Sequence, residues 1–143
     1  MGKGLIAVIA VNNLGFIGKN NTIMWRCSAD LKHFKAMTLE AKMVCGYNTY
    51  ETLPNVVKAR TVVLDPRGEL FDGEHTFTRL DQSNTVCIGG KKTYEKYAPY
   101  LTELHISHIN DNQIGDCTFP DLSNLNPECK IFNYYFEING NQA

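Results

Sequence analysis

The chain has 143 residues, enough to bury an apolar core of its own, and we expect one domain over residues 1–143. Hydrophobic residues make up 43% of the sequence and charged residues 20%, which is ordinary for a globular protein. The formal net charge of −1 gives no electrostatic reason to expect nucleic acid or a charged membrane as a partner. Nothing in the sequence demands more than a monomer.

The cysteine pattern and the first residues favour a reducing, cytoplasmic location. Five cysteines are scattered along the chain without a C-x-x-C motif, which favours free thiols over a disulfide framework. The apolar run that begins at Leu5 stops at Asn12 without a small-residue cleavage site, so we expect no signal peptide. No window approaches the roughly 18 apolar residues that cross a bilayer.

The first third of the chain predicts a buried strand, a long loop and two strand-to-helix units. The continuous apolar run Leu5–Val11 is typical of a strand buried on both faces. The polar stretch 12–25 is long for a connection, and long loops are often functional. Ser28 can cap a helix that runs to about Met37. A strand at Met43–Cys45 is then followed by a short helix at about Tyr47–Leu53.

The rest of the chain continues to alternate strands with helical segments. Strands are predicted at Arg60–Leu64, His75–Phe77, Thr85–Ile88, Leu104–Ile109 and Lys130–Ile138. A helix is predicted at Lys91–Tyr97, after the pair Gly89-Gly90. This alternation predicts an α/β fold with a central, mostly parallel sheet flanked by about four helices. The tyrosines and phenylalanines near the C-terminus favour an antiparallel edge strand.

Three segments lie where an open α/β sheet binds ligands, just beyond the carboxyl ends of its strands. They are the 12–25 loop, the junction Gly46–Thr49 and the junction Gly89–Lys92. Two glycine-containing helix N-termini could together hold the pyrophosphate of a dinucleotide. No G-x-G-x-x-G follows the first strand, so a standard Rossmann site is not indicated.

Asp30 is the candidate for chemistry, because it falls in the first turn of the first helix, just past the long loop. Taken alone, such an acid is most often an exposed partner of the helix dipole. Buried beside a heterocycle, a carboxylate could instead accept two parallel hydrogen bonds from an amidine-like edge, with a raised pKa. His105 and His108 are three apart on a strand and make a poor metal pair, and we expect no metal site.

Six segments of the sequence, in order, carry a family resemblance. They are LIAVIAVNNLGFIGKNN (5–21) with Trp25 after it, SADLKHFK (28–35), MVCGYNTYE (43–51), VCIGGKKTYE (86–95), HISHI (105–109) and GDCTFP (115–120). Together they resemble the dihydrofolate reductase family over nearly the whole chain. The resemblance implies reduction of dihydrofolate to tetrahydrofolate by hydride transfer from NADPH, with NADH possible, in support of one-carbon metabolism and thymidylate synthesis.

The resemblance also implies roles for individual residues. Asp30 would bind the pterin's 2-amino group and adjacent ring nitrogen, and Ser107 would hydrogen-bond Asp30 where the family usually has Thr. The implied catalytic residues are Asp30, Trp25, Ser107 and Tyr94. The implied substrate-binding residues are Ile6, Ala7, Asp30, Leu31, Phe34, Lys35, Leu53, Arg60, Ile88 and Ser107. The implied cofactor-binding residues are Ala10, Ile17, Gly18, Gly46, Tyr47, Asn48, Thr49, Leu64, Asp65, Arg67, Ile88, Gly89, Gly90, Lys91, Lys92, Thr93 and Tyr94.

Two further features follow from the resemblance. In the family the glycine pair is joined by a cis peptide bond, which is implied here for Gly89-Gly90. Residues 17–25 would close over the nicotinamide and exclude water, and Asp116 would hold that loop closed.

Departures from the family pattern affect both ligands. Tyr47 replaces an Arg that would contact the cofactor's phosphates, and the third strand is followed by Asp65-Pro66-Arg67, whose carboxylate would repel a 2′-phosphate. We therefore expect weakened selectivity for NADPH over NADH, unless Arg67 or Lys92 compensates.

The expected Arg for the substrate's glutamate tail aligns with Ala59, between Lys58 and Arg60. Because neighbouring strand residues face opposite sides, either a register change aims Arg60 at the tail or the tail is held more weakly. Met24 also replaces a common Pro, which would loosen the loop.

Two alternatives remain open at this point. One is a reductase of similar fold that acts on another pterin or on a riboflavin-pathway pyrimidine. The other is a binding or structural module that keeps the fold without turnover.

Overall fold

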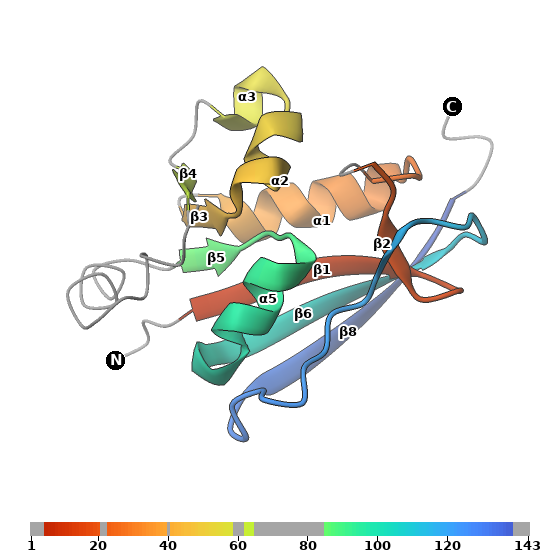
Figure 1. The fold of residues 1–143 in the computed structure, drawn as a ribbon. Coiled ribbons are helices and arrows are strands. Elements are labelled where there is room, and N and C mark those ends of the chain that lie inside the picture. Colours follow the sequence, from red (N-terminus) through yellow and green to blue (C-terminus); the bar gives the residue numbers. More distant parts are fainter. Residues whose placement is uncertain (1–4, 21–22, 40, 59–61, 65–84, 139–143) are drawn as a thin grey trace.

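The computed structural model describes residues 5–20, 23–39, 41–58, 62–64 and 85–138. Its main feature is a six-stranded parallel sheet with the order β4-β3-β5-β1-β6-β8 (Figure 1). The strands of this sheet are β1 (Leu5–Asn12), β3 (Lys42–Cys45), β4 (Val62–Leu64), β5 (Thr85–Cys87), β6 (Leu101–Asn110) and β8 (Lys130–Glu137). A separate antiparallel pair joins β2 (Phe16–Gly18) to β7 (Cys117–Thr118).

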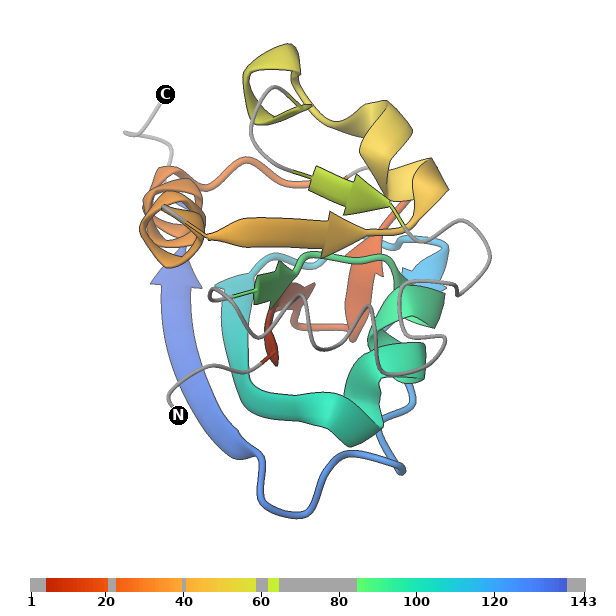
Figure 2. The same ribbon diagram turned by 90° about the vertical axis from the view of Figure 1, so that its left-hand side faces the viewer.

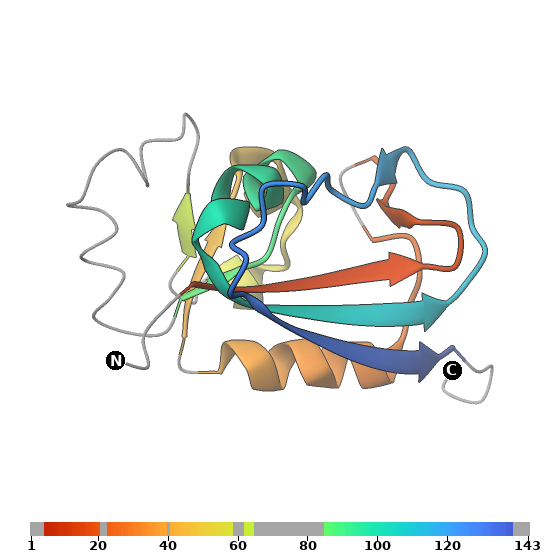
Figure 3. The ribbon, with the colours of Figure 1, turned by 90° about the horizontal axis from the view of Figure 1, so that it is seen from below.

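The helices lie on both sides of this sheet. Within the described residues they are α1 (Ser28–Thr38), α2 (Tyr47–Thr52), α3 (Asn55–Lys58), α5 (Lys91–Tyr97) and the 3-10 turn η2 (Ala98–Tyr100). Figure 2 looks along the axis of α1 and shows β8 next to that helix. Figure 3 shows α1 on one side of β1, β6 and β8, and α5 on the other. The predicted α/β class and the parallel centre of the sheet are confirmed.

β1 lies at the centre because its apolar side chains can be buried on both faces. It pairs in parallel with β5 on one side and with β6 on the other. Its odd-numbered residues, such as Ala7 and Ile9, join the core cluster on the α5 side. Ala10 instead packs with Trp25, Cys27 and Ile109 near the start of α1. The two faces of one strand therefore anchor two different layers of side chains.

The predicted antiparallel edge strand is wrong. β8 runs parallel to β6, from the pair Glu103–Lys130 to the pair Asn110–Glu137. The connecting segment 111–129 returns along the molecule before β8 begins, as a parallel pairing requires (Figure 3). An alternating pattern such as KIFNYYFE fits a half-buried strand in either direction, so it could not fix the direction.

The predicted element boundaries need smaller corrections. Ser28 is the first residue of α1 rather than its cap; Cys27 holds the N-cap position and makes no capping side-chain bond. The 12–25 segment, predicted as loop, contains β2. β6 begins at Leu101, earlier than predicted, and the predicted strand at 75–77 lies outside the described residues.

All five cysteines are free thiols, as predicted. None of the helices within the described part of the chain is long and apolar enough to span a membrane.

Candidate active site

Asp30 and Ser107 form the polar centre of the candidate site. Asp30 is buried in the first turn of α1, with 8% of its surface exposed, and accepts a hydrogen bond from the Ser107 hydroxyl on β6. Burial raises the pKa of Asp30 above its ordinary value of 3.8, outweighing the bond from Ser107 and the charge of His33, which lower it. The first turn of α1 therefore carries a buried carboxyl group whose proton affinity is raised.

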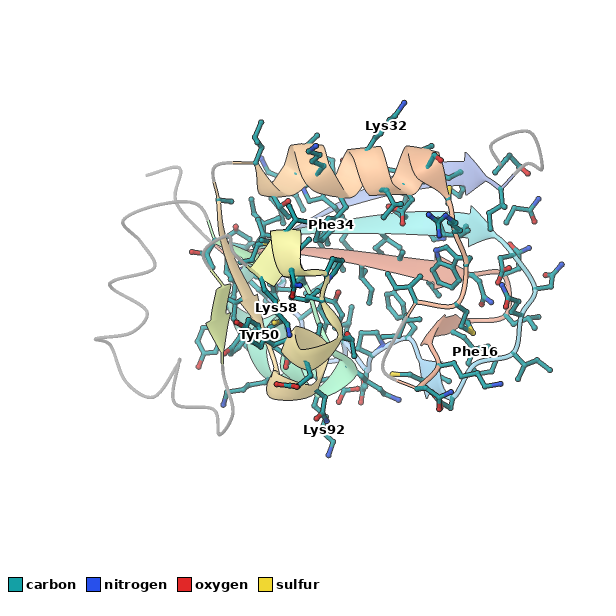
Figure 4. All side chains as sticks on the ribbon, turned by 90° about the horizontal axis from the view of Figure 1, so that it is seen from above. Phe16, Lys32, Phe34, Tyr50, Lys58 and Lys92 are labelled. Atoms are coloured by element: carbon teal, nitrogen blue, oxygen red, sulfur yellow. The ribbon has the colours of Figure 1, made fainter. Side chains whose placement is uncertain are left out.

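Half-buried apolar side chains lie on the helix that carries this acid, at the end of α2 and on β1. Phe34 is half-buried on the side of α1 that faces α3, whereas Lys32 points outward (Figure 4). Leu53, the C-cap of α2, and Ile6 on β1 are also half-buried. Partly exposed apolar side chains of this kind are the surface that the faces of a flat, partly polar ring would cover.

Three of the residues predicted to bind substrate are less well placed to contact a ligand near Asp30 with their side chains. Leu31 is 55% exposed and Lys35 is exposed on α1. The Ala7 side chain lies in the core on the α5 side, so only its backbone could reach a ligand near Asp30. Arg60, predicted for the glutamate tail, lies outside the described residues.

Trp25 packs close to this centre, in the cluster formed with Cys27 and Ile109. Its side chain is 8% exposed, and its indole Nε1 is buried without a hydrogen-bond partner among the described residues. Because a buried donor without a partner is costly, Nε1 is available to a ligand or to a water molecule beside one.

The two glycine junctions meet beyond the ends of β3 and β5. The peptide bond between Gly89 and Gly90 is cis, which confirms the prediction for this pair. The Gly46 N–H donates to the Gly89 carbonyl over 2.9 Å and so ties the start of α2 to the pair. Gly89 has a φ of +125°, a backbone conformation that residues other than glycine rarely adopt. At Gly90, an added Cβ would lie 3.1 Å from Thr49 Oγ1. Glycine at these positions therefore lets the side chains of Thr49 and Tyr94 pack directly against the backbone of the pair.

Tyr94 packs against the glycine pair. Its hydroxyl donates to the Val8 carbonyl on β1 over 2.6 Å, and burial raises its pKa well above 10. A Cβ on Gly89 would lie 3.5 Å from this hydroxyl. Because the hydroxyl keeps its proton and is committed to β1, Tyr94 positions the junction and is a weaker candidate for proton transfer.

The remaining cofactor candidates differ in how they are placed. Half-buried positions are held by Ala10, Ile17, Thr49, Ile88 and Lys91, buried positions by Gly18 and Thr93, and exposed positions by Asn48 and Lys92. Lys91 Nζ donates to Thr118 Oγ1 over 2.8 Å, and Lys92 points away from α5 (Figure 4). Tyr47 and Leu64 belong to described elements without described side chains, and Asp65 and Arg67 lie outside the described residues.

The predicted loop is held by the segment that follows β6. The Asn20 N–H donates to the Asp116 carboxylate at 3.1 and 3.3 Å, and the Asp116 N–H donates to the Gly18 carbonyl over 3.0 Å. Gly115 lies so close that a Cβ there would be 2.3 Å from the Gly18 oxygen. The contact between Asp116 and the loop, which the resemblance implied, is therefore present.

Sequence reasoning missed Asn12 as a second anchor of this loop. Its buried amide donates to Asp111 Oδ2 over 3.0 Å and to the Gln113 carbonyl over 2.7 Å. Its oxygen accepts from the N–H groups of Leu14 and Phe16. The sequence did offer a signal for this role, because Asn12 is a polar residue at the end of an apolar strand.

Comparison with known proteins supports the same assignment. The family model described as dihydrofolate reductase matches residues 4–130. Dihydrofolate reductase type 3 of Salmonella typhimurium is 34% identical over 131 residues, which cover 85% of this chain and 80% of that protein. Dihydrofolate reductase of Mycoplasma genitalium is 31% identical over 128 residues, or 78% and 80% of the two chains.

A solved structure is also similar. It is a dihydrofolate reductase from Enterococcus faecalis complexed with NADP(H) and RAB-propyl, with a TM-score of 0.68 and 26% sequence identity. The match covers 84% of this chain and 79% of that one.

Proposed function

The chain belongs to the dihydrofolate reductase family, and from this premise we propose how its residues carry the reaction. It reduces dihydrofolate to tetrahydrofolate with NADPH. The observation that carries the residue assignment is the buried carboxyl of Asp30, hydrogen-bonded to Ser107.

Asp30 binds the polar edge of the pterin. A carboxylate accepts two hydrogen bonds from an amino group and the adjacent ring nitrogen, and such paired, charge-assisted bonds are strong. Ser107 fixes the carboxylate from the other side. Phe34, Ile6 and Leu53 then contact the ring and the benzoyl group, so that the ring lies with its reactive edge toward the glycine junctions. The raised proton affinity of Asp30 favours polarisation of the ring toward protonation.

The residues at the glycine junctions fit a dinucleotide. NADPH, when bound, supplies the hydride. The backbone at Gly46, Gly89 and Gly90 is free of Cβ atoms where the cofactor's phosphates and nicotinamide would approach, and Thr49 and Thr93 offer hydroxyl groups beside them. The 17–25 loop, held by Asp116, excludes water from the reacting edges.

The wider setting is proposed on the same premise. A monomeric, cytoplasmic enzyme of one domain, without nucleic-acid or membrane partners, suits a reaction between two small molecules. Its product serves one-carbon metabolism and thymidylate synthesis.

The experiment that tests the function follows the oxidation of NADPH by purified protein. We expect oxidation that requires dihydrofolate and that a 2,4-diaminopyrimidine inhibits, because that ring presents the same amidine-like edge to Asp30. Turnover of another pterin, or of a riboflavin-pathway pyrimidine, in preference to dihydrofolate would replace the proposed substrate.

Cofactor selectivity should be weaker than is usual for an NADPH enzyme. Asp65 would repel a 2′-phosphate and accept a bond from a free ribose hydroxyl, and Tyr47 supplies no cation. We expect kcat/KM with NADPH to exceed that with NADH by less than 100-fold, a margin of about 2.7 kcal/mol. A larger preference would reject this account and direct attention to Arg67 and the exposed Lys92, which Lys92→Ala would test.

The substrate's glutamate tail should depend more on Arg60 than on Lys58. Lys58 Nζ lies 5.2 Å from the centroid of the Tyr50 ring, a cation–π contact that keeps it near α2 (Figure 4). We expect Arg60→Ala to raise KM for dihydrofolate about 10-fold, the cost of one charge-assisted bond, and Lys58→Ala to change it little. If neither substitution changes KM, the tail is held elsewhere.

A further inference from the structure

A chain of polar side chains crosses the face of the sheet under α1. His105 on β6 is buried, and its two ring nitrogens have partners on either side. Nε2 lies 2.8 Å from Glu103 Oε1, and Nδ1 lies 2.7 Å from the Tyr134 hydroxyl on β8. The ring therefore bridges the Glu103 carboxylate and the Tyr134 hydroxyl. The Tyr134 ring is thereby fixed at one end.

His33 packs on that fixed ring. It lies on α1, one turn after Asp30, with its ring centroid 4.2 Å from the Tyr134 centroid and 5.8 Å from that of Phe136. Its Nε2 is buried and has no hydrogen-bond partner among the described residues. Packing on Tyr134 therefore holds the ring, and no hydrogen bond to Nε2 from the described residues fixes its protonation state.

The neighbours of His33 can be named element by element. Its own helix contributes Asp30, β6 contributes His105 with Glu103 behind it, and β8 contributes Tyr134. β1 faces the helix with the apolar residues Ile6, Val8 and Ala10, which pair with Glu103, His105 and Ser107. Asp30 is thus the acid that acts on His33 directly, and His105 is the base that opposes its charge.

Asp30 and His33 on α1 each change the pKa of the other. Burial lowers the pKa of His33 from 6.5, although Asp30 raises it, and burial raises the pKa of Asp30 from 3.8, although His33 lowers it. When two titratable groups interact, the charge of one depends on the protonation state of the other.

We propose that His33 is a positioning residue that sets the charge state of Asp30, held for this task against the Tyr134 ring by the Tyr134–His105–Glu103 chain. Its relevance to catalysis rests on the proposed function, but its effect on Asp30 is a property of the protein alone. When His33 is protonated, its charge lowers the proton affinity of Asp30 and favours the ionised carboxylate. When His33 is neutral, the proton affinity of Asp30 is higher.

The test measures the proton affinity of Asp30 directly, by NMR titration of protein labelled with carbon-13 at the aspartate carboxyls. The Asp30 signal is identified by its absence from Asp30→Asn. His33→Phe keeps a ring on Tyr134 but removes the charge, so the midpoint of Asp30 should rise by about 0.5 to 1 pH unit. His33→Lys restores a cation and should return the midpoint to the wild-type value or below.

His108→Phe is the matched control, because His108 lies on the same strand but on the opposite face, where it contacts Asn133 and Tyr135. It should leave the Asp30 midpoint unchanged. The pH profile of kcat/KM should move with the midpoint in His33→Phe and stay in place in His108→Phe. Thermal unfolding of each variant identifies any that fail to fold, and for those His33→Gln replaces His33→Phe.

An unchanged midpoint in folded His33→Phe would overturn the proposal. Equal shifts in His33→Phe and His33→Lys would also overturn it, because shape rather than charge would then be the cause. These results do not depend on turnover, so a protein that fails to oxidise NADPH would count against the proposed function and leave this proposal testable.

Discussion

Replacing Asp30 with Asn should lower kcat/KM for dihydrofolate by about 10²- to 10⁴-fold, the usual effect of removing a group that assists proton transfer. The amide keeps the shape of the side chain and a contact with Ser107, but it cannot accept two bonds from the pterin as an anion. Steady-state kinetics with saturating NADPH measures the loss. Activity within 3-fold of wild type would show that the acid does not act on the substrate.

The same substitution should stabilise the fold at neutral pH. The pKa of Asp30 is raised in the folded protein, so the folded state favours the protonated acid and loses stability as the pH rises from about 3.8 through the raised value. The amide that replaces the carboxyl does not titrate, so urea unfolding should show a stability advantage of Asp30→Asn that appears over this window and persists at pH 7.

Asp121 provides the opposite control for stability. It is exposed, and bonds from the Ser123 backbone and side chain lower its pKa. Its contribution is present above the ordinary value of 3.8 and is lost as the pH falls through the lowered value. Asp121→Asn should therefore bring no gain at pH 7. A gain in both variants would indicate a general charge effect rather than the burial of Asp30.

Gly115→Ala should be the second most damaging substitution, although Gly115 does not contact either ligand in our account. A Cβ there would lie 2.3 Å from the Gly18 carbonyl oxygen and 2.9 Å from Met24 Sδ, so the backbone of the loop must move. Displacements of about 1 Å at a reacting site can cost about 10²-fold in rate. We expect kcat/KM to fall by about 10- to 100-fold, with weaker binding of NADPH.

Ile114→Ala is the control for this prediction. It introduces the same side chain one residue earlier, at a position that is 70% exposed, and should leave both kcat/KM and NADPH affinity near wild type. Wild-type kinetics in Gly115→Ala would mean that the segment 111–118 does not hold the loop in the reacting complex.

The elements that the sequence predicted correctly are those marked by a strong pattern within a few neighbouring residues. The β1 run is apolar throughout, and α5 begins after a glycine pair and ends before the turn that carries Pro99, so its bounds Lys91–Tyr97 agree with the prediction. β2 and β7 are too short to stand out from their loop, with three and two residues. The direction of β8 depends on how the chain returns from β6, which alternation does not encode.

The site shows the same division between local and distant information. The place of Asp30 at the head of a helix follows from its neighbours in sequence. The bond from Tyr94 to the Val8 carbonyl joins residues 86 positions apart and depends on how α5 packs on β1. His33 had a local signal, one turn after Asp30, but its packing on Tyr134 depends on the parallel placement of β8.

The central claim is that the Asp30 carboxyl grips the amidine-like edge of the pterin beside the cofactor. The most direct test is the affinity of a 2,4-diaminopyrimidine, measured calorimetrically with NADPH present, for wild type and for Asp30→Asn. We predict that the substitution weakens binding by about 10²-fold or more, because it removes a paired, charged contact. Equal affinities in two folded proteins would contradict the claim.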